Sequence, residues 1–424
     1  MSRSSDVTIF GATGFTGQRV AAEALRSLPP ELRITIAGRS SSKLQALAQQ
    51  LGAADRLQVL GGVDVTKPES LQAMAQATRL LLCCVGPFRL YGEPVLAAAA
   101  AARTDYLDIC GEPEFIERME LRYSAAAAAS GALMASAAGF DSVPADMGCL
   151  FAQRAFAPPA VPSSVEAVIS LSAPKGTSIH YATWESAVHG IGSVAELRKL
   201  RAEARRAGGA PPPPRPLGPR PAAPAGPAWE HRLARYTLPF PGADAAIVRR
   251  TQAAIAAAGE PAVHFSARFS LPSAWAAALF VAYGGLMVAL ARFSWGRALL
   301  LRAPGLFSRG LVSHAGPSQA QMDTTRTTLD LFAAGYSSPP PPGTAPGKPD
   351  KHVHCRVSLG DPGYLFTSVM LVQCAATLLQ ERQALLDSVG GRGGVFTVGT
   401  LFRGSSLLQR LDEHGVKFSV VGSS

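Results

Sequence analysis

The sequence predicts an α/β protein, with a doubly wound parallel sheet in residues 1–150 and an α+β domain in residues 151–424. Three observations support this prediction. A strand pattern near the N-terminus runs into three closely spaced glycines and a helix pattern; strand and helix patterns then alternate up to about residue 150; later strands alternate polar with apolar residues. At 424 residues the chain is long enough for two domains and a large core.

The first strand pattern covers residues 7–10, and the motif Gly-Ala-Thr-Gly-Phe-Thr-Gly follows at residues 11–17, ahead of a helical pattern. A pyrophosphate bound at a helix N-terminus needs close backbone approach, which a Cβ would obstruct. The strand and helix around the motif therefore favour a Rossmann dinucleotide-binding turn, although glycines kept only for close packing are the alternative. The predicted cofactor contacts here are Gly11, Thr13, Gly14, Phe15, Thr16 and Gly17.

The second strand pattern, residues 33–37, ends just before Arg39. At this position an acidic residue binds the ribose 2′-hydroxyl of NAD, whereas a basic residue accommodates the 2′-phosphate of NADP. Arg39 therefore predicts NADP, the alternative being an ordinary solvated arginine. The predicted contacts on this side are Arg39, Ser40, Lys43 and, in a third strand region at 57–60 and 63–65, Asp64.

The apolar strand pattern at 80–85 ends in Gly86-Pro87-Phe88, and those at 106–110 and 132–136 end before further polar residues. Cofactor and substrate meet at this carboxyl edge of a parallel sheet, so Val85, Gly86 and Pro87 are predicted cofactor contacts. The candidate proton donors at the strand ends are Tyr91, Asp108, Glu112, Asp141 and Ser142, of which Tyr91, Glu112 and Asp141 are the predicted catalytic residues. For Glu112 and Asp141 the alternative is capping of the following helix.

Beyond residue 150 the pattern changes to strands with one wet face and longer helices. The predicted strands are 165–171, 263–271, 352–359 and 417–421, and the predicted helices are 183–206, 369–381 and 400–411. Two proline-rich stretches, 208–227 and 338–349, predict surface loops, and the first has so few apolar anchors that we expect it to be mobile.

Residues 273–291 contain no charge and form the core of a hydrophobic segment that extends to residue 307. As a helix this stretch would be about 28 Å long, close to the thickness of a bilayer's hydrocarbon core. The segment therefore predicts membrane association, the alternative being a buried core helix. The stretch is long enough for a single crossing, but Gly284 and Gly285 also suit a bend, and we favour a hairpin because it would keep both flanks on the cytosolic side.

Composition indicates which partners, metal sites and cellular compartment to expect. The net charge of +10 comes mostly from scattered arginines, so without a recognisable nucleic-acid module we expect no nucleic-acid partner. Six cysteines without C-x-x-C spacing indicate buried thiols in a reducing compartment, and eight histidines without an H-x-x-x-H pair predict no metal site. The short polar start suggests no signal peptide, so we expect the protein to face the cytosol.

Several blocks together resemble the saccharopine dehydrogenase-like oxidoreductases, a family related to trans-acting enoyl reductases. They are the glycine motif at 11–17, CVGPFRLYGEP at 84–94, YLDICGEP at 106–113, GFDSVPAD at 139–146, TWESAVHG at 183–190, ELRKLR at 196–201 and GDPGY at 360–364. The resemblance implies an N-terminal NAD(P)-binding domain, a C-terminal α+β domain and association with lipid droplets or other membranes. It implies no particular reaction.

Two functions follow from these patterns. One is an NADP-dependent oxidoreductase acting on a lipid-like C=C or C=O bond at the cytoplasmic face of a membrane or lipid droplet. The other is an NADPH-binding scaffold or redox sensor at the same surface that does not turn over. The sequence leaves open the substrate, the direction of the reaction and the oligomeric state, including a homodimer.

Overall fold

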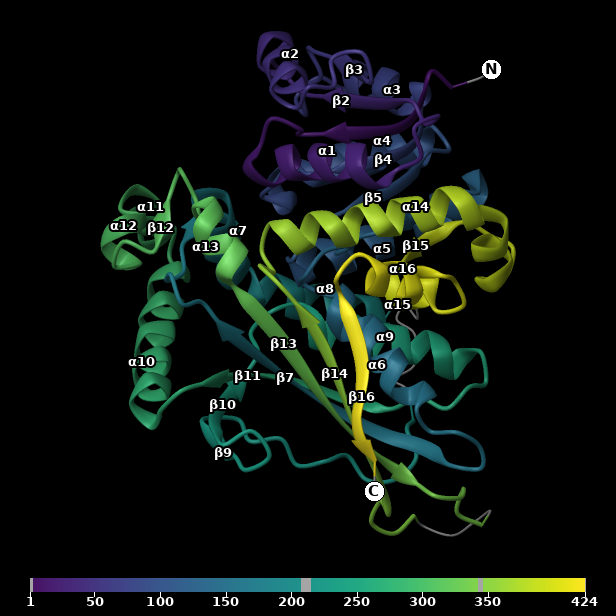
Figure 1. Ribbon diagram of the computed structural model, residues 1–424, viewed down its shortest axis with the longest axis vertical. Helices are drawn as coiled ribbons and strands as arrows, with labels where there is room; N and C mark the ends of the chain where they lie inside the picture. The colour runs from purple at the N-terminus through teal and green to yellow at the C-terminus, as the bar shows by residue number, and fades with distance from the viewer. Residues whose placement is uncertain (1–2, 207–214, 342–345, 424) are drawn as a thin grey trace.

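The computed structural model describes residues 3–206, 215–341 and 346–423, whose elements are labelled in Figure 1. The N-terminal part contains β1 (Ser5–Phe10), α1 (Phe15–Ser27), β2 (Ile34–Ala37), α2 (Ser41–Gln50), β3 (Leu57–Leu60), α3 (Pro68–Ala77), β4 (Thr78–Cys83), α4 (Phe88–Ala101), β5 (Asp105–Asp108), α5 (Pro113–Ser130), β6 (Leu133–Ala135) and α6 (Val143–Arg154). The rest contains β7 (Val161–Ser172), β8 (Ile179–His180), α7 (Tyr181–Gly192), α8 (Val194–Arg206), β9 (Ala228–Glu230), β10 (Arg235–Pro239), α9 (Asp244–Ala257), β11 (His264–Leu271), α10 (Ala274–Ala291), α11 (Ser294–Arg302), α12 (Pro304–Phe307), β12 (Val312–Ser313), α13 (Gln319–Thr324), β13 (Arg326–Tyr336), β14 (Lys351–Leu359), α14 (Leu365–Ser388), β15 (Gly394–Phe396), α15 (Val398–Phe402), α16 (Leu407–Glu413) and β16 (Lys417–Ser423).

The first sheet is parallel, with strand order β15-β6-β5-β4-β1-β2-β3, which confirms the predicted α/β class. Every residue of β1 and β2 is buried, as expected for strands covered on both faces. Residues 63–65, predicted as part of the third strand, lie outside β3. The sheet also gains a strand that the sequence did not predict, because the three residues of β15 are too short to show a period.

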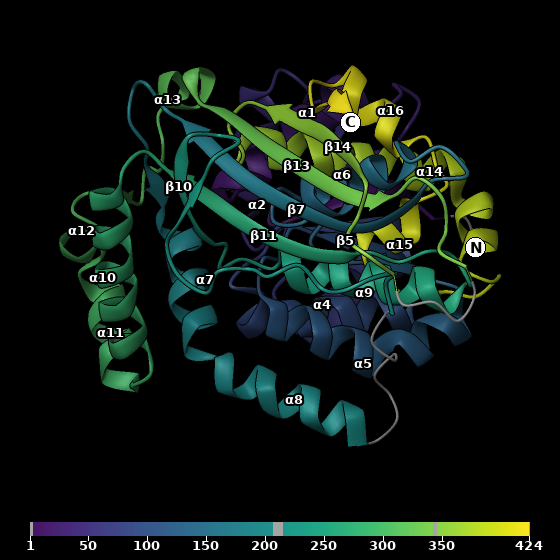
Figure 2. The same cartoon turned by 90° about the horizontal axis from the view of Figure 1, so that it is seen from below.

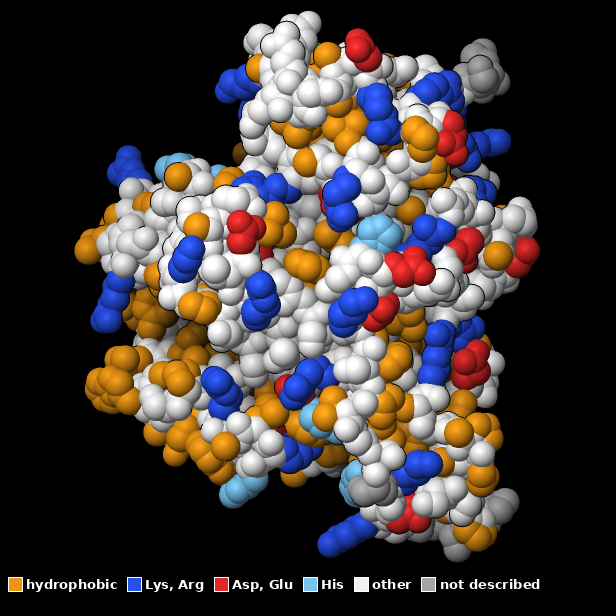
Figure 3. Space-filling view, viewed as in Figure 1, with side chains coloured by type: hydrophobic (Ala, Val, Ile, Leu, Met, Phe, Trp, Pro, Cys, Tyr) orange, Lys and Arg blue, Asp and Glu red, His pale blue; other side chains and the backbone are white. Residues whose placement is uncertain are grey.

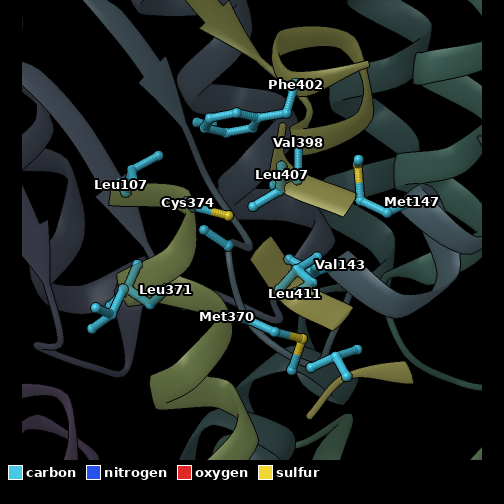
Figure 4. Close-up of a cluster of buried hydrophobic side chains, with 14 of the residues drawn as sticks. Leu107, Val143, Met147, Met370, Leu371, Cys374, Val398, Phe402, Leu407 and Leu411 are labelled. Carbon is cyan, nitrogen blue, oxygen red and sulfur yellow. The ribbon is translucent and has the colours of Figure 1, made fainter. Parts of the chain in front are cut away.

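A shared core joins the C-terminal helices to the first sheet. α14 packs against α1, and its residues 367–378 are all buried. Figure 4 shows Leu371 and Cys374 of α14 in one cluster with Leu107 of β5 and with side chains from α6, α15 and α16. The single helix predicted over 400–411 is wrong, since α15 and α16 are separate.

The second sheet has strand order β16-β14-β13-β7-β11-β10-β9. On β7 the alternating Val165, Ala167 and Ile169 are buried in the core with α6, whereas Glu166 and Ser170 are partly exposed, as predicted for a strand with one wet face. The sequence did not predict β13, which lies between β7 and β14 and is antiparallel to both.

The described part of the first proline-rich stretch, 215–227, lies in no helix or strand. It is held to the second sheet, because Arg268 donates to Pro224 O at 2.7 Å and to Gly226 O at 3.1 Å, and the Ser163 hydroxyl donates to Leu217 O. These contacts tie parts of the loop to the sheet, and its mobility stays a prediction. Positions 208–214 of this loop, and 342–345 of the second proline tract, lie outside the described residues.

The predicted helix 183–206 is two helices, α7 and α8, separated at Ser193. The hydrophobic segment 273–307, here named the apolar arm, forms α10, α11 and α12, which project from the body of the molecule in Figure 2. α10 runs unbroken through Gly284 and Gly285, so the predicted bend there is wrong. The chain turns instead at residues 292–293, and α11 packs back against α10.

Most of the arm is exposed. Among the described residues α10 alone is long and apolar enough to cross a membrane, and only 17% of it is buried, which excludes the alternative of a buried core helix. Trp275, Trp295 and Leu306 are 71%, 61% and 76% exposed. In Figure 3 hydrophobic side chains gather along the left edge of the molecule, where Figure 1 places α10.

Candidate functional site

The glycine motif forms the turn between β1 and α1, as predicted. Gly11 has a φ of +83°, and a Cβ there would lie 2.7 Å from the Val85 side chain. A Cβ on Gly17 would lie 2.2 Å from Gly11 O. No side chain caps the N-terminus of α1 within the described chain, so its first-turn N–H groups remain available to a ligand, at a turn where Gly11 and Gly17 have no room for a Cβ.

This turn lies at the point where the strand order reverses. β1 pairs with β2 on one side and with β4 on the other, and the chain leaves β2 and β4 in opposite directions across the sheet. Cys84 N donates to Phe10 O at 2.9 Å, which places Val85, Gly86 and Pro87 beside the glycine turn. In open α/β sheets ligands bind in the crevice at such a switch point.

The residues predicted to recognise the adenosine end gather at the ends of β2 and β3. Arg39 is exposed, and the Ser40 hydroxyl caps α2 by accepting from Lys43 N at 3.3 Å. Hydrogen bonds from Thr66, followed by the charge of Arg39, lower the pKa of Asp64. Arg39 and Asp64 therefore lie close together, with the Arg39 side chain free to reach a phosphate.

Glu112 is occupied by a helix end. Its buried carboxylate accepts hydrogen bonds from Phe88 N at 2.9 Å and Arg89 N at 3.2 Å, so it caps α4 rather than the helix that follows it in the chain. Burial is the main influence on its pKa, which is raised. Tyr91 lies on the first turn of the same helix and is 39% exposed.

The Asp108 and Asp141 carboxylates differ in their hydrogen bonding. Asp108 is fully buried and accepts from Cys110 N, Ala137 N and the Ser136 hydroxyl at 2.9–3.0 Å, so it joins the ends of β5 and β6. The Asp141 carboxylate lies against Gly111, where a Cβ would be 2.3 Å from it, and it has no hydrogen-bond partner among the described residues. Burial raises its pKa. Of the two predicted catalytic carboxylates, Glu112 is therefore engaged by backbone N–H groups and Asp141 is not.

α7 lies beside this edge of the first sheet, a position that the sequence did not predict. Its C-terminal end is held by Arg89, which donates to His189 O at 3.0 Å, and Ser186 lies near the Glu112 carboxylate. On its other face Trp184 and Val188 are buried against the apolar arm. One helix therefore touches both the crevice and the arm.

Phe15 of the glycine motif contacts two distant segments. The His180 ring stacks on it with centroids 4.7 Å apart, and the Tyr364 ring meets it edge-on at 4.8 Å. His180 precedes α7, and Tyr364 ends the GDPGY block. The GDPGY block was visible in the sequence and His180 lies three residues before the TWESAVHG block, but nothing local connects residues so far apart.

The nucleotide-binding part matches the family model for the saccharopine dehydrogenase NADP binding domain over residues 7–134. A saccharopine dehydrogenase-like oxidoreductase of Homo sapiens is 36% identical, in an alignment covering 99% of this chain and 97% of the relative. The chain belongs to this family. It is therefore an NADP-binding oxidoreductase, which confirms the predicted family and cofactor.

Other relatives extend along the whole chain. One from Arabidopsis thaliana, 34% identical over 98% of this chain and 96% of its own, is named a "Probable mitochondrial saccharopine dehydrogenase-like oxidoreductase". A "Lipid droplet localized protein" of Caenorhabditis elegans is 28% identical over 98% of both. Saccharopine dehydrogenase of Saccharomyces cerevisiae, with a TM-score of 0.53 at 12% identity, covers 99% of this chain and all of its own, which shows a shared fold.

The glycine turn fits NADP. The uncapped first turn of α1 offers its N–H groups to the pyrophosphate, and a Cβ at Gly11 or Gly17 would fill the space that lets the turn form. Arg39 would hold the 2′-phosphate. When bound, NADP supplies or accepts a hydride, and the chain must orient it, exclude water and handle the accompanying proton.

Proposed function

We propose that this oxidoreductase transfers a hydride between NADP and a C=C or C=O bond of a lipid-like substrate, at the cytosolic face of a membrane or lipid droplet. The observation that carries the proposal is the position of α7, with one face on the crevice and the other on the apolar arm. A lipid held at the arm would have only one helix to pass on its way to the crevice.

The arm supports a lipid surface as its partner. A contiguous apolar surface of this kind marks an interaction site, and Arg292, Arg302 and Arg309 beside it would contribute about 1 kcal/mol each near anionic headgroups. β11 before the arm and β13 after it belong to one sheet, so both flanks stay in one compartment. An arm embedded in lipid would therefore enter and leave from the same side. The name of the C. elegans relative, a lipid droplet localized protein, is consistent with such an arrangement.

Asp141 is the group to which we assign the proton. Reduction of a polar double bond needs one proton for each hydride, and a carboxyl whose pKa is raised stays protonated closer to neutral pH. Glu112 then acts as a positioning residue, since its carboxylate holds the start of α4 at the crevice.

The test uses purified full-length protein, NADPH and a long-chain trans-2-enal dispersed in phosphatidylcholine vesicles. We expect NADPH oxidation in the presence of the vesicles, and a loss of roughly 10²- to 10⁴-fold in turnover for Asp141→Asn at unchanged NADPH affinity. The exposed Asp55→Asn is the matched control and should keep full activity.

Other results separate the alternatives. Tight NADPH binding without oxidation of the 2-enal or of crude lipid extract would favour the scaffold. Protein that does not float with the vesicles would contradict the lipid surface, and full turnover of Asp141→Asn would move the proton donor elsewhere, with Tyr91 next to be tested.

A further inference from the structure

We propose that His180 and Tyr364 are positioning residues of the NADP site, and that α7 couples this site to the apolar arm, so that seating the arm on lipid tightens NADP binding. The inference rests on the proposed function, because it takes lipid as the arm's partner. It concerns how the cofactor site is regulated rather than which bond reacts.

Phe15, the only large side chain in the glycine motif, is surrounded by residues from distant parts of the chain. Besides the His180 and Tyr364 rings, the Arg19 guanidinium lies 3.8 Å from its ring centroid. Gly316, with a φ of +67°, approaches so closely that a Cβ there would be 2.7 Å from the ring. The backbone N–H groups that receive the pyrophosphate flank a side chain held mostly by the C-terminal part of the chain.

His180 cannot move independently of α7. The Nδ1 atom of His180 accepts from Ala182 N at 3.2 Å and so caps the helix. The backbone N–H of His180 donates to the Tyr364 hydroxyl at 2.8 Å. The Thr183 hydroxyl lies 3.3 Å from the same Tyr364 oxygen. The residue whose ring stacks on Phe15 is therefore the N-cap of α7.

The same end of α7 is joined to the arm. One residue after Thr183, the Trp184 indole donates to Leu300 O of α11 at 3.1 Å, and Trp184 and Val188 pack with Met287 and Leu300 in one buried cluster. Close-packed side chains of this kind move together. A change in the position of the arm must therefore be transmitted to α7 and to His180.

We expect lipid to tighten NADP binding because lipid would order the arm. In water nothing in the described chain covers the outer face of α10, whereas lipid would hold the arm and, through it, α7 and the Phe15 contacts in one arrangement. A binding loop that is already ordered loses less entropy when its ligand binds. By linkage, NADP must strengthen lipid binding by the same factor by which lipid strengthens NADP binding.

The experiment measures the Kd of full-length protein for NADPH by fluorescence, with and without vesicles of phosphatidylcholine and phosphatidylserine. We expect vesicles to lower the Kd at least about fivefold, within the range typical of coupled sites. Vesicle flotation with and without saturating NADPH should give the reciprocal factor.

Variants localise the effect. Phe15→Leu and His180→Ala should still float but bind NADPH equally with and without vesicles, and Tyr364→Phe, which keeps the ring and loses the bond to His180, should retain part of the difference. His352→Ala, an exposed histidine on β14, is the matched control and should behave as wild type. Thermal melts identify any variant that has lost its fold.

The outcomes separate this inference from the proposed function. Protein that fails to float contradicts the lipid surface itself. Protein that floats with one Kd for NADPH in both conditions overturns the coupling alone, as does full coupling in both Phe15→Leu and His180→Ala.

Discussion

The crevice is closely packed, whereas the apolar arm leaves large hydrophobic side chains exposed. At the crevice a Cβ on Gly17 would lie 2.2 Å from a carbonyl oxygen, and the buried Asp108 and Glu112 carboxylates are satisfied by backbone N–H groups. On the arm Trp275 is 71% exposed, and a Cβ on Gly284 would have no neighbour within 4 Å. Contacts within the chain account for the packing of the crevice, whereas the described residues leave most of the arm's apolar surface uncovered.

The largest effect should come from adding one methyl group at the crevice. Gly17→Ala places a Cβ against Gly11 O and the backbone of Ala12, which cannot shift without opening the turn. We expect a loss of at least about 100-fold in NADPH affinity, measured by fluorescence titration, since the turn and the start of α1 together form the phosphate site. Wild-type affinity in a folded Gly17→Ala protein would contradict the assigned turn.

A buried carboxyl near the crevice should make stability depend on pH. Asp146 accepts from the Thr251 hydroxyl at 2.8 Å and Gly399 N at 2.7 Å, and burial raises its pKa to about 6. Because the folded value lies above the unfolded one, this stabilising contribution is complete below about pH 4 and is lost as pH rises through 6.

Asp146→Asn keeps one side-chain oxygen, which can still accept from the Thr251 hydroxyl and Gly399 N, and it carries no charge. The free energy of unfolding of wild type should therefore fall by about 2–3 kcal/mol relative to Asp146→Asn between pH 4 and pH 7, measured by urea titration at each pH. Parallel pH curves for the two proteins would show that Asp146 titrates normally. The arm offers no equivalent, since residues 273–307 contain no Asp or Glu.

Replacing an exposed arginine should change NADPH affinity at the crevice but not on the arm. Arg39→Ala should weaken NADPH by roughly tenfold to 100-fold while leaving NADH unchanged, because only NADPH carries the 2′-phosphate. Arg302→Ala on the arm is the matched control and should change neither affinity. Equal affinity of wild type for NADPH and NADH would refute the role of Arg39.

The smallest effect should be a gain in stability on the arm. Gly284→Ala adds a methyl group in open space within α10, so helix propensity should stabilise the protein by about 0.5–1 kcal/mol, measured by urea unfolding, without changing NADPH affinity. A loss of vesicle binding in this variant would show that the glycine contacts the lipid closely. The contrast with Gly17→Ala would then be between two contact surfaces, one of them outside the chain.

The sequence by itself determined the features that depend on neighbouring residues. The glycine turn, the basic residue after the second strand, the alternation on β7 and the uncharged run in α10 each lie within a few turns of chain, where period and residue type predict conformation directly. The same local reasoning identified Glu112 as a possible cap but assigned it to the following helix.

Only the tertiary structure decided which of these pieces meet. It placed the Glu112 carboxylate on α4, gave Asp141 no hydrogen-bond partner among the described residues, added β15 to the first sheet and brought His180 and Tyr364 onto Phe15. These contacts join residues 24 to about 350 positions apart, so they depend on strand order and on the packing of α7 and α14 rather than on any local period. For the same reason the sequence left a buried core helix open as the alternative for α10: a run of apolar residues has the same sequence pattern inside a core or on a surface, and only the neighbours supplied by the fold distinguish the two.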